Sequence, residues 1–183
     1  MAEKKTNFVQ GISEILVKQG VFSPKTAAEM PVLFEQSPKE FFDDFLLEEG
    51  LVSKEALLNA LSEYYKMPFF DVVGYFINHQ LVTLFPKDEL LRNAFLPLWL
   101  EEDILTVVAS RPEERHLRDL INQYVDFGIE FYVGIGRDIT SAAKEFYDRA
   151  PSEESKDEEW QEADQEEQEE EIARGSLLEE EEF

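Results

Sequence analysis

The sequence contains no cysteine among its 183 residues. Disulfide staples and thiolate metal sites are therefore excluded, although cytosolic proteins are often cysteine-poor and this absence alone does not fix the compartment. Long apolar runs are missing too. No stretch approaches the roughly 20 apolar residues that span a bilayer, and the N-terminal segment follows a helical period instead of that of a signal peptide. We interpret the chain as soluble and cytoplasmic.

Residue types suited to catalysis are also scarce. The only histidines are His79, in an expected loop, and His116, in a charged helical stretch expected to be exposed. Neither has carboxylates at the spacing of a metal triad, and no G-x-x-x-x-G-K-[ST] nucleotide loop occurs. We interpret the paired carboxylates Asp43–Asp44 and Glu48–Glu49 as solvated faces, since such pairs are expected in so acidic a chain. The sequence predicts neither an enzyme nor a metal site.

Positive charge is in short supply, with 17 lysines and arginines against 41 acidic residues and a net charge of −24. Residues 151–183 hold 16 acidic and 2 basic residues, which is −14 of that charge and leaves −10 for residues 1–150. Both parts should repel nucleic acid and anionic membrane surfaces.

Residues 151–183 have few apolar side chains and heavy like charge, so burial cannot offset the entropy of ordering them. We predict a disordered acidic tail here. Trp160, Ile172 and the ending "SLLEEEEF" are apolar exceptions that would suit short docking elements, but a solubilising tail is the favoured interpretation.

Residues 1–66 are predicted to form a helical subdomain, because apolar residues recur there at helical spacing. Gly20 and Gly50, thirty residues apart, each end one helical pattern and are followed by two apolar residues and a serine. Glycine adopts the left-handed conformation that stops a helix, and Ser23 or Ser53 can cap the next one. Pro24 suits the first position of its helix. The sequence therefore predicts two copies of a helix-turn-helix unit.

In residues 67–150, strand patterns appear between the helical ones. "PLWLEEDILTVVAS" reads as a hairpin around a Glu-Glu-Asp turn, and "IEFYVGI" reads as a further strand. Between them, a helical period places Leu117, Leu120, Ile121 and Tyr124 on one side, and a last helix is expected to start with Asp138 as its cap. The prediction is a small β-β-α-β-α subdomain, so the fold class is α+β.

The order of several short segments resembles the N-terminal domain of type II secretion and type IV pilus assembly ATPases, the GspE N-terminal or MshEN family. The segments are "FLLEEGLVSKEALLNALSEYYKMPFFDV", "LVTLFPKDELLRNAFLPLWLEEDILTVVASRP" and "GIEFYVGIGRDITSAAKEFY". Together the resemblance covers about Phe8 to Tyr147. It implies a helical subdomain and a small α/β subdomain that form one domain, without the ATPase core that follows in that family. Two explanations stay open, a free-standing relative and a chain that lost its ATPase half, although the acidic ending looks natural rather than truncated.

Two roles are implied by the resemblance: docking onto the cytoplasmic part of an inner-membrane platform protein, and binding cyclic di-GMP. The nucleotide-binding version carries Arg-Leu-Gly, an apolar pair, Gly, another apolar pair and a terminal Gln in each helix-turn-helix. Positions that match this pattern are of the structural kind: Leu16, Val17, Gly20, Val21, Leu46, Leu47, Gly50, Leu51, Val52, Leu57 and Leu61. The polar positions do not match, because the arginines fall on Gly11 and Phe41 and the glutamines on Phe34 and Tyr64.

Cyclic di-GMP is therefore the disfavoured alternative, and no cofactor is predicted. Arginine supplies bidentate hydrogen bonds and stacking that lysine does not reproduce. The first arginine of the chain is Arg92, so the helical part could neutralise a phosphate only through a lysine such as Lys18 or Lys39. A divergent site in the α/β part, built on Arg92, Arg111, Arg115 or Arg118, stays open.

The favoured interpretation is a non-catalytic protein–protein docking or regulatory module, a bacterial adaptor that binds a membrane-platform or motor component. Recruitment to the inner membrane would then depend on that partner. Exposed aromatic residues rimmed with acid would form such a surface, and its partner should be basic or apolar. The candidate docking surface consists of Phe34, Phe42, Tyr64, Tyr65 and Phe76.

Overall fold

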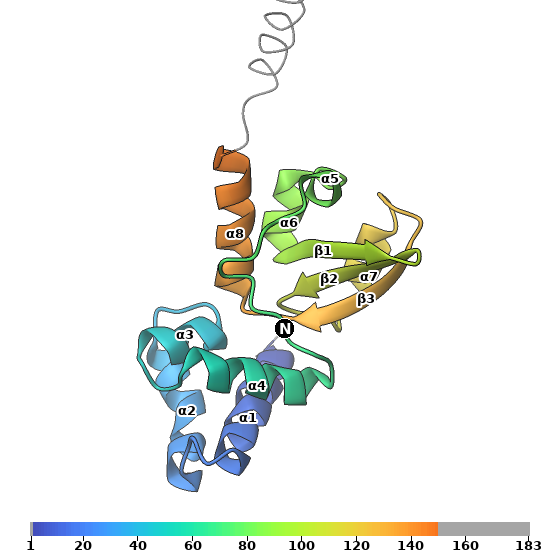
Figure 1. Ribbon diagram of the computed structural model, residues 1–183. Helices are drawn as coiled ribbons and strands as arrows, with labels where there is room; N and C mark the ends of the chain where they lie inside the picture. Colours follow the sequence, from blue (N-terminus) through green and yellow to red (C-terminus); the bar gives the residue numbers. More distant parts are fainter. Residues whose placement is uncertain (1, 150–183) are drawn as a thin grey trace, which may run out of the picture. The chain divides into compact units, whose positions relative to one another are not determined.

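The computed structural model describes residues 2–149. In chain order, the elements are α1 (Ala2–Lys18), α2 (Pro24–Gln36), α3 (Phe42–Glu48), α4 (Lys54–Tyr65), α5 (His79–Val82), α6 (Lys87–Asn93), β1 (Phe95–Glu101), β2 (Ile104–Ala109), α7 (Arg115–Ile121), β3 (Gly128–Val133) and α8 (Gly136–Arg149) (Figure 1). The α+β class expected from the sequence is confirmed. The acidic tail, with Trp160, Ile172 and the ending "SLLEEEEF", lies outside the described residues, and the division at residues 67 and 151 stays a prediction.

The two helix-turn-helix units are built by the same local hydrogen bonds. Gly20 and Gly50 have φ angles of +73° and +64°. After each glycine, the next amide donates back to the last helical turn, from Val21 to the Leu16 carbonyl and from Leu51 to the Leu46 carbonyl, both at 2.9 Å. These bonds satisfy carbonyl groups that a helix end leaves free. The glycine stops predicted at both positions are confirmed.

The serines after these turns cap the following helices. The Ser23 hydroxyl accepts a hydrogen bond from the Thr26 amide at 3.0 Å, and the Ser53 hydroxyl accepts one from the Ala56 amide at 3.2 Å. Both serines have extended backbone angles, as an N-cap requires. Pro24 stands at the first position of α2, where its missing N–H costs nothing.

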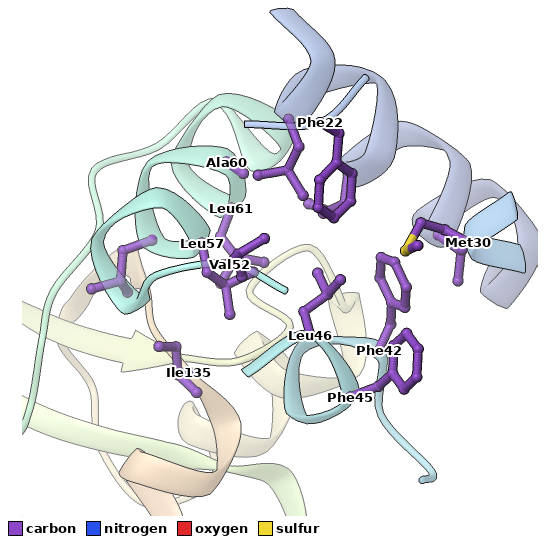
Figure 2. Close-up of a cluster of buried hydrophobic side chains, with 14 of the residues drawn as sticks. Phe22, Met30, Phe42, Phe45, Leu46, Val52, Leu57, Ala60, Leu61 and Ile135 are labelled. Carbon is purple, nitrogen blue, oxygen red and sulfur yellow. The ribbon is translucent and has the colours of Figure 1, made fainter. Parts of the chain in front are cut away.

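The helical part encloses a core of buried side chains from α1, α2, α3 and α4. Figure 2 shows a part of this core, with Leu46 and Leu57 among the labelled side chains. Leu46 and Leu57 are completely buried, and Phe22 packs there from the first turn segment. Val133 and Ile135, from the end of β3 and the residues after it, belong to the same cluster. The helical core therefore continues onto the α/β part.

The sheet has the order β1-β2-β3. Strands β1 and β2 form the expected antiparallel hairpin, and its turn places Glu102 and Asp103 at φ angles of +48° and +62°. Strand β3 pairs in parallel with β2 after a crossover through α7, as parallel pairing requires. At the other edge of β3, Phe69 forms an isolated parallel bridge with Val133.

Three details of the α/β part differ from the sequence prediction. Helix α8 begins at Gly136, so Asp138 lies inside its first turn and is not its cap. His79 belongs to the short helix α5 and not to a loop. Tyr124 lies beyond the end of α7 and is 40% exposed, because the helix ends at Ile121 before the next turn can place it on the buried side.

Candidate functional site

A cleft of about 570 Å³ is lined by residues that are far apart in the sequence, from Asn7 to Thr140. Helices α1 to α4 contribute one set of lining residues. The end of α6, the segment between β2 and α7, and the first turn of α8 contribute the other. Its volume is in the range of small-ligand and peptide side-chain sites. This cleft is the candidate functional site.

Aromatic rings make up one wall of the cleft. Phe8 lies edge-on to Tyr64 with 5.2 Å between ring centroids, and Tyr64 lies edge-on to Tyr65 at 4.9 Å. Phe34 contacts Phe42 at 5.3 Å in the same manner. Edge-to-face pairs at these separations are favourable beyond simple burial, so the rings stabilise one another as a wall.

Four of the five residues of the candidate docking surface meet at this cleft. Phe34, Tyr64 and Tyr65 are half-buried there, and Phe42 is only 3% exposed and belongs to the core. Phe76 is 89% exposed and does not line the cleft. The structure therefore groups the aromatic residues of the helical part and leaves Phe76 apart from them.

Most of the positions that match the nucleotide-binding pattern lie in or against the core of the helical part. Leu16, Leu46, Val52, Leu57 and Leu61 are buried, and Val17, Leu47 and Leu51 pack against the same core. Val21, in contrast, is 39% exposed.

The positions where that pattern has arginine and glutamine are occupied by packing contacts. A Cβ atom placed on Gly11 would lie 2.5 Å from Cε2 of Tyr64, so the tyrosine ring fills the space above this glycine. Phe34 packs on Phe42 and Phe45. Phe41 carries the guanidinium of Arg111 over its ring, with Cζ 5.1 Å from the ring centroid. These positions therefore serve packing in this chain.

Two adjacent carboxyl groups also line the cleft. Burial raises the pKa of Asp43 against the opposing effect of backbone N–H groups, one of them that of Gly136 at the start of α8. Burial raises the pKa of Asp44 as well, and the neighbouring Asp43 carboxyl adds to this. One Asp44 oxygen, Oδ1, is buried and has no hydrogen-bond partner among the described residues. The sequence interpretation of this pair as a solvated face is therefore wrong, since the cleft forms only after folding.

Ion pairs connect the helical part to α8 beside the cleft. Lys54, at the start of α4, donates to Asp71 at 2.6 Å and lies 3.0 Å from Asp138 in α8. Glu48 of α3 pairs with Lys39, and its other oxygen lies 3.9 Å from Arg137. The contacts with α8 were not predicted from the sequence, because they join residues that are far apart in the chain.

Only two of the four arginines proposed for a divergent nucleotide site lie in the cleft. Arg92 and Arg111 line the cleft, and Arg137 lies there with them. Arg118 instead donates to the Ile129 carbonyl and lies over the Phe131 ring, and Arg115 is not part of the lining. Both histidines are exposed. Within the described part of the chain, no three metal-ligating side chains come together, and no helix has the length and apolar character needed to cross a membrane.

The solved structures of MshE and of the N-terminal domain of XpsE have the same fold, so the resemblance expected from the sequence is confirmed. Residues 65–153 match the model of the MshEN domain family.

Two solved structures illustrate the likeness. The structure of MshE with cdg is 23% identical, with 74% of this chain and 98% of that chain covered and a TM-score of 0.60. The N-terminal domain of XpsE is 16% identical, with 73% and 92% covered and a TM-score of 0.53. Among curated proteins, none matches the chain.

Proposed function

We propose that this chain is a non-catalytic docking and regulatory module of a type II secretion or type IV pilus system. It binds an inner-membrane platform protein or an assembly ATPase from the cytoplasm, and its partner recruits it to the membrane. The observation that carries this proposal is the aromatic wall of the cleft, in which rings stand at the positions that are polar in the nucleotide-binding pattern.

The aromatic wall suits a protein partner better than a small anion. Tyrosine and phenylalanine are enriched in the centres of protein interfaces, where they bury large areas at low entropic cost. The polar groups needed for phosphate and guanine are missing at the pattern positions. No nucleic-acid partner is proposed, because the described part of the chain shares the acidic character of the whole sequence.

A binding assay with the full chain tests the proposal. The immobilised chain is incubated with the purified cytoplasmic domains of the platform protein and with the assembly ATPase from the same cell. The N-terminal domain of that ATPase serves as the positive control. We expect saturable binding of at least one component. Binding of neither, while the control domain binds, would refute the proposal.

Cyclic di-GMP is the second candidate, and the likeness to the structure of MshE with cdg favours it. Calorimetric titration with this nucleotide at low and at physiological salt distinguishes a docking module from a nucleotide receptor. We expect no binding heat, because aromatic contacts occupy the relevant positions. Micromolar or tighter binding would instead make the chain a receptor for this nucleotide.

A further inference from the structure

The cleft is lined by both basic and acidic side chains, but the two kinds differ in the contacts that they make within the chain. Arg111 lies over Phe41. Arg92 lies 3.4 Å from Glu89, and Arg137 lies 3.5 Å from Asp138. Arg92 and Arg137 therefore each have a carboxylate partner, whereas the ring of Phe41 does not neutralise the charge of Arg111.

The carboxylates at the rim of the cleft, in contrast, form no ion pairs with basic side chains of the described part of the chain. Glu40, Glu113 and Glu114 line the cleft and are exposed. Among the residues whose side chains are described, none forms an ion pair or a side-chain hydrogen bond with these three glutamates. Three free carboxylates outnumber the Arg111 guanidinium, so the net charge at the rim is negative.

The free carboxylates stand next to the aromatic wall. Glu113 lines the cleft together with Tyr64 and Tyr65. Burial raises the pKa of both tyrosines and the Glu113 carboxylate raises each further, while the Arg111 guanidinium acts in the opposite direction at Tyr65. A cation is attracted to the face of an aromatic ring and to a carboxylate at the same time, so the two features reinforce each other. The same arrangement is unfavourable for a phosphate or an acidic peptide.

We propose that the cleft receives a basic segment of the partner protein, in which an arginine or lysine lies beside an apolar side chain. The apolar side chain packs against the wall formed by Phe8, Phe34, Tyr64 and Tyr65, and the cation reaches Glu113 and Glu114 at the rim. This inference rests on the proposed docking function and specifies the surface and the chemistry of the partner. The tail of the chain itself is a poor occupant, because residues 151–183 carry 16 acidic residues.

The net charge of the chain also favours a basic partner segment. The net charge of −24 attracts a basic segment before contact, and this attraction accelerates association at low salt. Affinity for the segment should therefore fall as salt rises, whereas packing against the rings is less sensitive to salt.

The test uses the ¹⁵N-labelled full chain and three capped peptides that differ only in charge. The probes are acetyl-Leu-Arg-Phe-Leu-Arg-amide and its counterparts with glutamine or glutamate in place of both arginines. We expect the arginine peptide to shift the amide signals of Phe41, Ser110 and Gly136 in a saturable way, the glutamine peptide to bind more weakly, and the glutamate peptide not to bind. Equal binding of the arginine and glutamine peptides, or no saturable binding of the arginine peptide, would overturn the inference.

Two matched double variants locate the charge effect. Glu113→Gln with Glu114→Gln neutralises the rim, and Glu101→Gln with Glu102→Gln removes the same charge from the β1–β2 turn, outside the cleft. The first pair should weaken the arginine peptide about three- to tenfold, and the second less than about twofold. Equal effects of the two pairs would show that only the overall charge matters, and the inference would fail.

The rim variant also separates the inference from the proposed function. If the platform protein or the ATPase binds the parent chain and the rim variant equally well, the inference fails and the docking function stands. If the arginine peptide binds at the cleft but neither secretion component binds the chain, the inference stands and the docking function fails.

Discussion

Replacement of Gly11 by alanine is expected to lower the stability of the chain, although alanine is the better helix former. Gly11 lies inside α1, and a Cβ atom there would lie 2.5 Å from Cε2 and 3.0 Å from Cδ2 of Tyr64. Atoms at these separations overlap, so the tyrosine ring has to move. Its neighbours Phe8 and Tyr65, with centroids at 5.2 Å and 4.9 Å, restrict that movement.

Two opposing terms set the size of the effect. Alanine in place of glycine inside a helix gains about 1 kcal/mol. Forcing an added methyl group into a packed site costs about 1–3 kcal/mol. With a cost near the middle of that range, the Gly11→Ala variant should be less stable than the parent chain by about 1 kcal/mol.

The same substitution in a chain that lacks the Tyr64 ring tests whether that ring causes the loss of stability. In a chain that already carries Tyr64→Ala, the ring is absent and Gly11→Ala should stabilise by about 1 kcal/mol. The coupling energy between the two positions is then about 2 kcal/mol. Urea unfolding followed by circular dichroism supplies all four free energies. If Gly11→Ala stabilises both backgrounds equally, the ring does not fill the space above Gly11, and an arginine side chain would have room there.

Three further predictions concern the capping serine, the buried carboxyl group and the ion pairs beside the cleft. Ser53→Ala removes the acceptor for the Ala56 amide and should lower the free energy of unfolding by about 1 kcal/mol, as urea unfolding measures; an unchanged value would mean that the cap contributes nothing. Burial raises the pKa of Asp43 above its ordinary value of 3.8, so in the window above that value the folded chain binds more protons than the unfolded chain, and stability falls as pH rises. Asp43→Asn lacks this fall, and its stability relative to the parent chain should increase between about pH 4 and about pH 7, by about 1.4 kcal/mol for each unit of pKa difference; a difference that stays constant with pH would contradict this. Lys54→Met breaks the pairs with Asp71 and Asp138, and because Lys54 is about one-third exposed the loss should be only about 1 kcal/mol and smaller at high salt; a loss that does not depend on salt would indicate a packing effect.

Local signals were sufficient to predict the helical part from the sequence. A glycine that ends a helix and a serine that begins the next act through bonds within about six residues, and both copies fold as predicted. The hairpin and the final strand were also predictable, because apolar and β-branched residues alternate or cluster there with turn residues between them.

The cleft could not be predicted in the same way, because its lining comes from residues that are brought together only by tertiary packing. Asp43 illustrates the reason. In the sequence it is one carboxylate among many, yet in the folded chain the backbone N–H of Gly136, at the start of α8, lowers its pKa against the effect of burial. The prediction that Asp138 caps this helix was wrong, since the helix begins at Gly136 and Asp138 lies inside its first turn.

The bridge between Phe69 and Val133 has a consequence for the order of folding. The Phe70 amide donates to the Val133 carbonyl and the Val133 amide donates to the Pro68 carbonyl, both at 2.9 Å. These bonds close a loop of more than sixty residues, whereas the β1–β2 hairpin closes across a two-residue turn. Because long loops cost more entropy to close, the segment from Pro68 to Phe70 should join the sheet last and leave it first. Early departure of this segment would expose the edge of β3 while the hairpin is still intact, and a strand from a second chain could then pair with that edge.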